Sequence, residues 1–178
     1  MELFPLYPER YKHLSDKIHE KEVLQEIEIT HSNYTPTDLI NHIAIGCVIK
    51  NDKNEVLLMF HKKFDKWTIP LGKVEPESNL NDTIIKEMKE ELNIEVISWN
   101  EIHKFEKTYN RKFEGVFHNV VADIRIIAVV SFQGEIKNIE NEKHLQLQWK
   151  PIDELQTTPT YCLSDATIEW MNLIGVKP

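Results

Sequence analysis

Three glutamates stand close together in one short stretch of the sequence, "IIKEMKEEL" at residues 84–92. If this stretch is helical, Glu87, Glu90 and Glu91 are neighbours at spacings of three and four residues. Like charges at these spacings repel each other by roughly a few tenths of a kcal/mol per pair in water. A solvated helix tolerates this repulsion, whereas a hard divalent cation such as Mg²⁺ would reverse it by binding the carboxylate oxygens. The cluster therefore indicates either a solvated helix face or a metal site.

The apolar residues around the glutamates predict a helix over residues 79–92 with two different sides. With Glu87 at zero on a helical wheel, Glu90 lies at about −60° and Glu91 at about +40°. We expect the apolar side to pack on a sheet, while the adjacent side presents the carboxylates. The apolar side spans roughly +60° to +160° and consists of Ile84, Ile85, Met88 and Leu92.

The rest of the chain is predicted to be mainly strands, which gives an α+β (mixed α/β) fold with helices packed on a mixed sheet. Asn79 or Asn81 can cap the start of the glutamate helix, and Asn93 can end it. Ser164 is a suitable cap for a last helix. The expected strands are 42–50, 55–60, 95–109, 117–132 and 144–149, and the last helix is 164–174.

The composition is that of an ordinary globular protein with an excess of acidic residues. The chain has 178 residues, of which 41% are hydrophobic, and 21 Lys and Arg against 29 Asp and Glu give a formal net charge of −8. This charge argues against a protein that binds long nucleic acid mainly through its phosphates. A small phosphorylated ligand is compatible with it, because a bound divalent cation can supply positive charge.

Cysteine usage and the first residues bear on the compartment. Cys47 and Cys162 lie far apart and fit no metal-ligand spacing, so we expect both to be reduced. Pro5, Pro8 and several charges stand where a signal peptide would need an apolar stretch. No segment is long and apolar enough to predict a membrane span. We therefore expect a cytoplasmic protein that has no membrane partner.

Residues 1–37 read as an extension before a main domain of residues 38–178. Within the extension, a mixed helical pattern covers residues 8–22 and an alternating pattern covers residues 23–30. The role of the extension stays open at this point. It could pair with a second copy of the chain in a homodimer, or it could cover the sheet of its own chain.

Residues 72–94 resemble the signature of the Nudix hydrolases, enzymes that cleave a nucleoside diphosphate linked to another group. The family pattern is G-x5-E-x7-R-E-U-x-E-E-x-G-U, in which U is an aliphatic residue. Gly72 and Lys86 have the spacing of the family's first Gly and its Arg. The positions that match are Gly72, Glu87, Met88, Glu90, Glu91 and Ile94.

Three positions depart from this pattern. Ser78 stands where the first Glu is expected, although Glu77 is one place earlier. Lys86 replaces the Arg, which keeps the charge but loses the forked contact that holds the family's glutamates. Asn93 replaces the last Gly, and this change is mild because Asn tolerates a left-handed cap. The first two departures leave a non-catalytic nucleotide-binding or regulatory module on the same fold as the alternative to an enzyme.

The segments on either side of this box also resemble the family. "HIAIGCVIKNDKNEVLLMFHKKFDKWTIPLGKVE" is similar to its lead-in, two strands followed by W-x-x-P-x-G-K-V-E. "ENEKHLQLQWKPIDEL" (140–155) is similar to its closing acidic loop, strand, Trp and short helix. The resemblance covers about residues 40–175 in the family's order, which makes an unrelated structural domain the least supported alternative. It implies an alpha/beta/alpha sandwich with a mixed sheet on which the glutamate helix packs.

The resemblance also implies a metal site and a reaction. Glu87, Glu90 and Glu91 would bind one or more Mg²⁺ ions, or Mn²⁺, and the backbone carbonyl near Leu71 and Gly72 would join them. The cation would neutralise charge on a diphosphate and polarise the attacking water. The implied partner is a small nucleotide, cleaved at a phosphoanhydride bond: a nucleoside triphosphate, a nucleotide sugar, ADP-ribose or a dinucleotide.

Four further residues have a functional and an ordinary interpretation. Lys86 would hold the glutamates in place of the Arg, or would be an exposed helix residue. Lys73 would touch a phosphate, or would be an exposed lysine, and Gly72 would let the chain approach the phosphates or simply make a turn. Glu142 is the candidate general base on a later loop, or an ordinary charged loop residue.

Aromatic residues supply candidates for stacking on a nucleobase, although each could equally belong to the core or the surface. Trp67 is expected to pack at the edge of the site. The eight histidines include no pair four residues apart, so no zinc site is predicted. The stacking candidates are Phe60, His61, Phe64, Tyr109, Phe117 and His118.

Overall fold

The computed structural model describes residues 40–62, 64–113, 116–142 and 144–176. The elements predicted at 8–22 and 23–30 lie outside these residues. By its internal contacts the chain divides into two units, and Ile43–Phe105 together with Ile124–Pro178 make up the unit that contains the glutamate helix. The other unit contains Glu106–Asp123.

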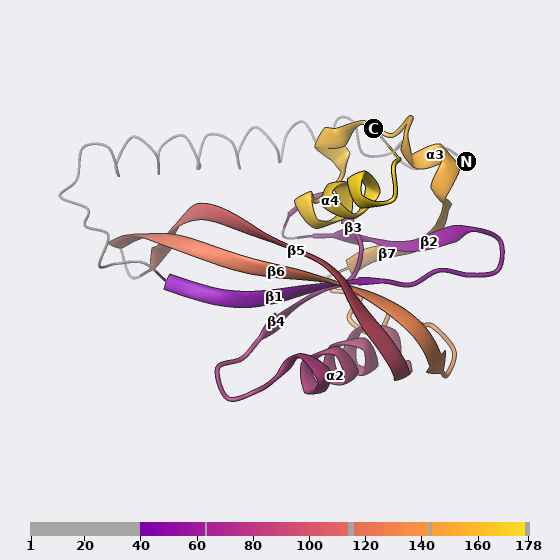
Figure 1. Ribbon diagram of the computed structural model, residues 1–178, viewed down its shortest axis with the longest axis horizontal. Coiled ribbons are helices and arrows are strands. Elements are labelled where there is room, and N and C mark those ends of the chain that lie inside the picture. Colours follow the sequence, from indigo (N-terminus) through magenta and orange to yellow (C-terminus); the bar gives the residue numbers. More distant parts are fainter. Residues whose placement is uncertain (1–39, 63, 114–115, 143, 177–178) are drawn as a thin grey trace. The chain divides into compact units, whose positions relative to one another are not determined.

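The larger sheet has four strands, which are β1 (Ile40–Val48), β4 (Leu71–Val74), β5 (Glu95–Phe113) and β6 (Val116–Gln133). Their order is β4-β1-β6-β5. β1 and β4 are antiparallel, with Ile45 opposite Gly72. β1 and β6 run in the same direction (Figure 1), so the sheet is mixed, as predicted.

The smaller sheet has three antiparallel strands, which are β2 (Glu55–His61), β3 (Lys66–Thr68) and β7 (His144–Pro151), in the order β3-β2-β7. A backbone hydrogen bond connects β2 to the residue that follows β1: the Leu57 N–H donates to the carbonyl of Ile49 at 2.9 Å. The Cys47 N–H in β1 donates to the carbonyl of Pro70 at 2.8 Å, which holds the segment that leads to β4 against β1.

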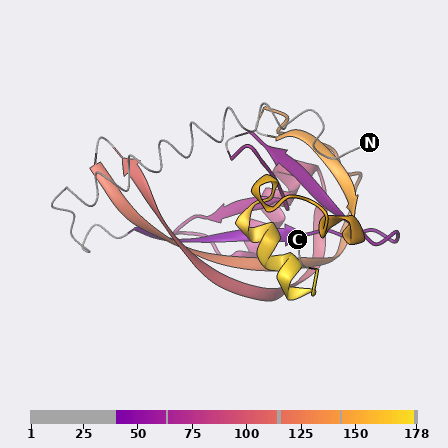
Figure 2. The ribbon, with the colours of Figure 1, turned by 90° about the horizontal axis from the view of Figure 1, so that it is seen from above.

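Two helices lie on opposite faces of the larger sheet. They are α2 (Leu80–Leu92) and α4 (Asp165–Leu173), below and above the strands in Figure 1. The view from above in Figure 2 has α4 in front of the strands. α2 is the longest described helix, with 13 residues, and none of the described helices could span a membrane.

Alternate residues of β1 face α2 and α4, which explains the continuous apolar run of this strand. Ile45, Cys47 and Ile49 lie in the core that also contains Met88 of α2. Gly46 points to the other face, where an added Cβ would lie 3.5 Å from the Cβ of Ala166 in α4. Because successive side chains of a strand point to opposite faces, a strand covered on both sides is apolar throughout.

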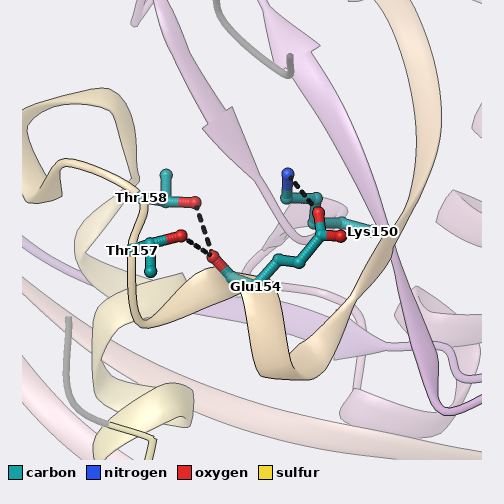
Figure 3. A network of polar contacts seen from close by, with 4 residues as sticks. All are labelled: Lys150, Glu154, Thr157 and Thr158. Atoms are coloured by element: carbon teal, nitrogen blue, oxygen red, sulfur yellow. Dashed lines mark hydrogen bonds and ion pairs between the residues drawn. The ribbon is translucent and has the colours of Figure 1, made fainter. Parts of the chain in front are cut away.

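A polar network closes the short helix α3 (Ile152–Leu155) that follows β7 (Figure 3). The ammonium of Lys150 lies 3.1 Å from a carboxylate oxygen of Glu154, four residues later. The hydroxyls of Thr157 and Thr158 donate to the backbone carbonyl of Glu154 at 2.8 and 3.3 Å. Together with the Thr157 N–H, which donates to the same carbonyl at 3.2 Å, these hydroxyls satisfy a carbonyl at the end of the helix.

Ser164 connects α4 to the smaller sheet and confirms the predicted start of the last helix. Its hydroxyl oxygen accepts from the Thr167 N–H at 3.2 Å and its hydroxyl donates to that of Thr68 at 2.7 Å. Its own N–H donates to the carbonyl of Trp67 at 2.9 Å. The cap therefore fixes α4 to β3, and Trp67 is fully buried beneath that junction.

Candidate active site

Local signals set both ends of the glutamate helix, as the sequence predicts. The side chain of Asn79 accepts from the Asp82 N–H at 2.8 Å and caps the first turn. Asn93 adopts a left-handed conformation with φ of 60°, and its N–H donates to the carbonyl of Lys89 at 3.1 Å. Both are short polar residues that tolerate these positions. The helix therefore carries the three glutamates within about one turn.

The orientation of the helix differs from the prediction. Glu91 is only 5% exposed, Glu87 is half-buried and Glu90 is exposed. Ile85, predicted on the buried side, is 37% exposed, whereas Thr83 is buried. With Glu87 at zero, the buried arc thus begins at about −40°, and Glu91 at about +40° lies inside it. Glu91 and, in part, Glu87 are therefore turned toward the sheet, and only Glu90 lies on the solvated side.

Gly72 in β4 explains how a glutamate can face the sheet. An added Cβ at this position would lie 2.8 Å from Cγ and 3.2 Å from Cδ of Glu87. It would also lie 3.3 Å from Cγ1 of Ile45 on the neighbouring strand. Only a residue without a side chain leaves this space to the carboxyl group of Glu87. Gly72 is therefore needed for close approach between helix and strand, in addition to any role toward a ligand.

Cys47 in β1 shows that two of the carboxylates are directed to the same region. Complete burial raises the pKa of the Cys47 thiol far above its ordinary value, and the charges of Glu91 and Glu87 raise that pKa further. A thiolate there would be both desolvated and repelled. Cys47 is thus a neutral core residue, and both it and Cys162 are free thiols, as expected.

A shallow hollow of about 100 Å³ lies beside Glu87, between β4 and α2. Lys86 and Lys73 bring positive charge to a lining that otherwise holds carboxylates and hydroxyls. The hydroxyls of Ser78 and Thr83 are 3.3 Å apart within it. Ser78 and Lys86, two residues that differ from the family pattern, therefore line the same hollow. The full lining is Lys73, Glu75, Glu77, Ser78, Thr83, Lys86 and Glu87.

The loop between β6 and β7 is attached to the last turn of the glutamate helix. The Ile139 N–H donates to the carbonyl of Glu91 at 3.1 Å, and the Lys137 N–H donates to that of Leu92 at 2.9 Å. Gly134, with φ of +103°, passes so close that an added Cβ would lie 2.8 Å from the carbonyl oxygen of Asn93. The acidic residues that follow Ile139 are consequently held near the end of α2.

Two glutamates of this loop differ in their surroundings. Glu142, the candidate base from the sequence, is exposed. Glu140 is half-buried, with one carboxylate oxygen shielded from solvent, and its backbone carbonyl accepts from the His144 N–H at 3.0 Å. Sequence reasoning passed over Glu140 because burial within "ENEKH" depends on the attachment at Glu91, which has no local signal.

The stacking candidates also separate by exposure. Phe60 is buried, with its ring 5.4 Å from that of Trp67 in an edge-to-face contact, so it does not face a ligand. Phe64 is 42% exposed and stacks on His61. The side chains of the other three candidates lie outside the described residues: Tyr109, Phe117 and His118.

The donor chemistry of the helix suits a hard divalent cation. Glu87 and Glu91 offer oxygen ligands on adjoining turns, and Glu90 lies at their solvent side. In the described part of the chain, no three His, Cys, Asp or Glu side chains already form a metal-binding group. The fit therefore rests on the type of ligand, on their spacing and on the space that Gly72 leaves, and side-chain rotation would complete it.

A family model described as NUDIX domain matches residues 40–171. The chain belongs to the Nudix family. The match includes the glutamate helix, Gly72 and the loop attached to that helix. The predicted enzyme class, a Nudix-type nucleotide pyrophosphohydrolase, follows from this membership.

Individual relatives agree with the family assignment. The uncharacterized Nudix hydrolase YvcI of Bacillus subtilis (strain 168) is 25% identical over 121 residues, which cover 64% of this chain and 68% of that protein. The crystal structure of a MutT NUDIX hydrolase from Burkholderia pseudomallei has a TM-score of 0.59 at 23% identity, covering 75% of this chain and 98% of that one. The solution structure of the ORF135 protein from E. coli has a TM-score of 0.56 at 23% identity, covering 82% and 99%. These two structures confirm the predicted fold.

Proposed function

We propose that this Nudix hydrolase cleaves a phosphoanhydride bond in a small nucleoside diphosphate derivative, with Mg²⁺ or Mn²⁺ as cofactor. The observation that supports this most is that Glu91 is buried and Glu87 half-buried on one side of α2, while Gly72 leaves space beside the carboxyl group of Glu87. A purely solvated helix face would leave its carboxylates exposed. Carboxylate oxygens gathered on the side of the helix that faces the sheet are the ligands that a hard divalent cation prefers. The substrate class includes nucleoside triphosphates, nucleotide sugars, ADP-ribose and dinucleotides.

Glu87, Glu90 and Glu91 would hold the cation, and the backbone carbonyl of Leu71 beside Gly72 would add an oxygen ligand. When bound, the cation would polarise the diphosphate and lower the pKa of a coordinated water. Within this set, Glu91 is fixed by burial, and Gly72 sets the space in which the Glu87 carboxyl can move. The exposed Glu90 is the ligand with the greatest freedom.

Lys86 and Lys73 would balance charge at the rim of this site. Both line the hollow that Glu87 also lines. Lys86 would hold the glutamates by charge alone, because an ammonium lacks the fork of a guanidinium. Lys73 would contact a phosphate oxygen of the substrate. In this arrangement the glutamates would be positioned mainly by the burial of α2 and less by Lys86.

Glu140 and Glu142 are the candidates for the group that takes a proton from the attacking water. We expect Glu140→Gln to lower kcat about tenfold or more, because a half-buried carboxylate beside α2 is better placed for general-base catalysis. Glu142→Gln should have a smaller effect. Steady-state rates of the two variants between pH 5 and pH 10 would compare them directly. A larger loss in Glu142→Gln would assign the base to the residue indicated by the sequence.

The proposed reaction is tested with a panel of purified nucleotides, each incubated with the full chain and Mg²⁺ or Mn²⁺. We expect hydrolysis of at least one member at a phosphoanhydride bond, complete loss of turnover with a chelator, and recovery when the cation is restored. Products identified by chromatography would show which bond breaks. Nucleotide binding without turnover across the panel would favour the alternative, a binding or regulatory module on the Nudix fold.

A further inference from the structure

We propose that the exposed ring of Phe64, stacked on His61, is the surface on which the base of the nucleotide substrate stacks. This inference rests on the proposed function, because it adds a base-recognition surface to the same site. It assigns a ligand chemistry to the turn between β2 and β3, namely a flat aromatic base.

The two rings form a prearranged pair. The ring centroids of Phe64 and His61 are 4.4 Å apart, and the planes are inclined by only 30°. His61 is in turn held by the edge of His144, with centroids 5.1 Å apart at 79°. His144 is 1% exposed, so the inner end of this stack is fixed in the core. A ring that is already ordered loses little conformational entropy when a base lies on it.

A backbone hydrogen bond also holds the residue next to Phe64. The Asp65 N–H donates to the carbonyl of His61 at 2.8 Å. Asp65 is 1% exposed and adopts a left-handed conformation with φ of 53°. Phe64 beside it is 42% exposed. A large apolar ring on a fixed turn costs free energy when it faces water, and a stacked ligand would recover part of it.

A short series of contacts places this stack on the catalytic side. His61 pairs with His144 across β2 and β7. The His144 N–H bonds to Glu140, and the next residue back, Ile139, bonds to the carbonyl of Glu91. The stack therefore adjoins the loop that is attached to the glutamate helix. A nucleotide with its diphosphate at the glutamates would have its base directed along this loop toward the turn.

Stacking on Phe64 predicts a particular kind of selectivity. A phenyl ring offers no hydrogen-bond donor or acceptor, so it recognises the area of a base and not its edge. Every base has such a face, and stacking on an aromatic side chain contributes on the order of 1–3 kcal/mol per base. We therefore expect purine nucleotides to bind more tightly than pyrimidine nucleotides at this surface.

The test compares binding of two probes by calorimetry in Mg²⁺: an α,β-methylene purine nucleoside triphosphate, and methylenediphosphonate, which has no base. We expect Phe64→Ala to weaken binding of the nucleotide about 5- to 150-fold, with binding of methylenediphosphonate unchanged. Phe64→Trp should retain the affinity, and its additional indole fluorescence should be quenched by the nucleotide. Ile97→Ala, a change at another exposed apolar residue in β5, is the matched control and should alter neither affinity.

Three results would contradict this inference. If Phe64→Ala binds the nucleotide as well as Ile97→Ala does, or weakens both probes equally, the base does not stack on Phe64, while hydrolysis of the panel would still support the proposed function. If the unaltered chain neither binds the nucleotide nor hydrolyses any member of the panel, the inference and the proposed function fail together. Unquenched fluorescence of Phe64→Trp at saturating nucleotide would count against the base surface alone.

Discussion

Glu91→Gln is expected to lower kcat by about 100- to 1000-fold while the protein stays folded. Gln has nearly the same shape as Glu, so it should occupy the buried position at 5% exposure without opening a cavity. What it removes is the negative charge that we propose as a cation ligand. Steady-state rates at saturating Mg²⁺, measured on the best substrate of the nucleotide panel, would give the size of the loss.

Thermal unfolding separates this explanation from simple damage to the fold. Without cation, Glu91→Gln should unfold at the same or a higher temperature, because it relieves the burial of a charge beside Glu87. Mg²⁺ should raise the midpoint of the unaltered chain and raise that of the variant much less, since a ligand stabilises the state that binds it. Glu95→Gln, at an exposed residue just beyond the helix, is the matched control. Equal rates and equal Mg²⁺ stabilisation in both variants would remove Glu91 from the cation site.

The parts of the fold that were predicted from the sequence are those with local physical causes. The caps at both ends act within one turn of the helix, so residue type indicated Asn93 at its end and left its start between Asn79 and Asn81, of which the structure has Asn79. The continuous apolar run of β1 likewise reports that the strand is covered on both faces. Both predictions could be made without knowing which other segments of the chain lie nearby.

The orientation of the helix could not be predicted in the same way. Hydrophobicity placed Ile85 on the buried side and Glu91 beside it, but the structure exposes Ile85 and buries Glu91. One contribution lies outside the helix, in Gly72 of β4, which leaves space for the side chain of Glu87 next to the sheet. The burial of Glu140 could not be predicted either, because it depends on a backbone hydrogen bond between Ile139 and Glu91, which lie far apart in the sequence. Residues at functional sites can depart from the hydrophobic pattern of their own helix or loop, because contacts with another segment offset the cost.

Ser78 and Lys86 are two of the three positions where this chain departs from the family pattern, and their effects on Glu87 are related. Both line the hollow beside Glu87, and Ser78 has its hydroxyl 3.3 Å from that of Thr83. A hydroxyl pair and an ammonium hold a carboxylate with less directional force than a guanidinium does. The geometry of Glu87 should therefore depend more strongly on its other neighbour, Gly72.

This dependence gives the second large effect, in which Gly72→Ala lowers kcat about 100-fold with little change in stability. The added Cβ would lie 2.8 Å from Cγ of Glu87, which is too close. The Glu87 side chain is flexible and can rotate away, so the conflict is resolved by moving the carboxyl group and not by unfolding. Alanine also reduces the entropy of the unfolded chain, which offsets part of the remaining strain.

The matched control for Gly72→Ala is Gly46→Ala, on the adjacent strand β1. Its added Cβ would lie 2.9 Å from Cδ1 of Ile69 and 3.5 Å from the Cβ of Ala166, on the face that packs against α4. We expect Gly46→Ala to lower the unfolding midpoint and to leave the Mg²⁺ concentration for half-maximal rate unchanged. Gly72→Ala should do the reverse, with a higher Mg²⁺ requirement at a nearly constant midpoint. The same Mg²⁺ requirement in both variants would show that the space beside Glu87 serves packing alone, because only a displaced cation ligand changes that requirement without unfolding the protein.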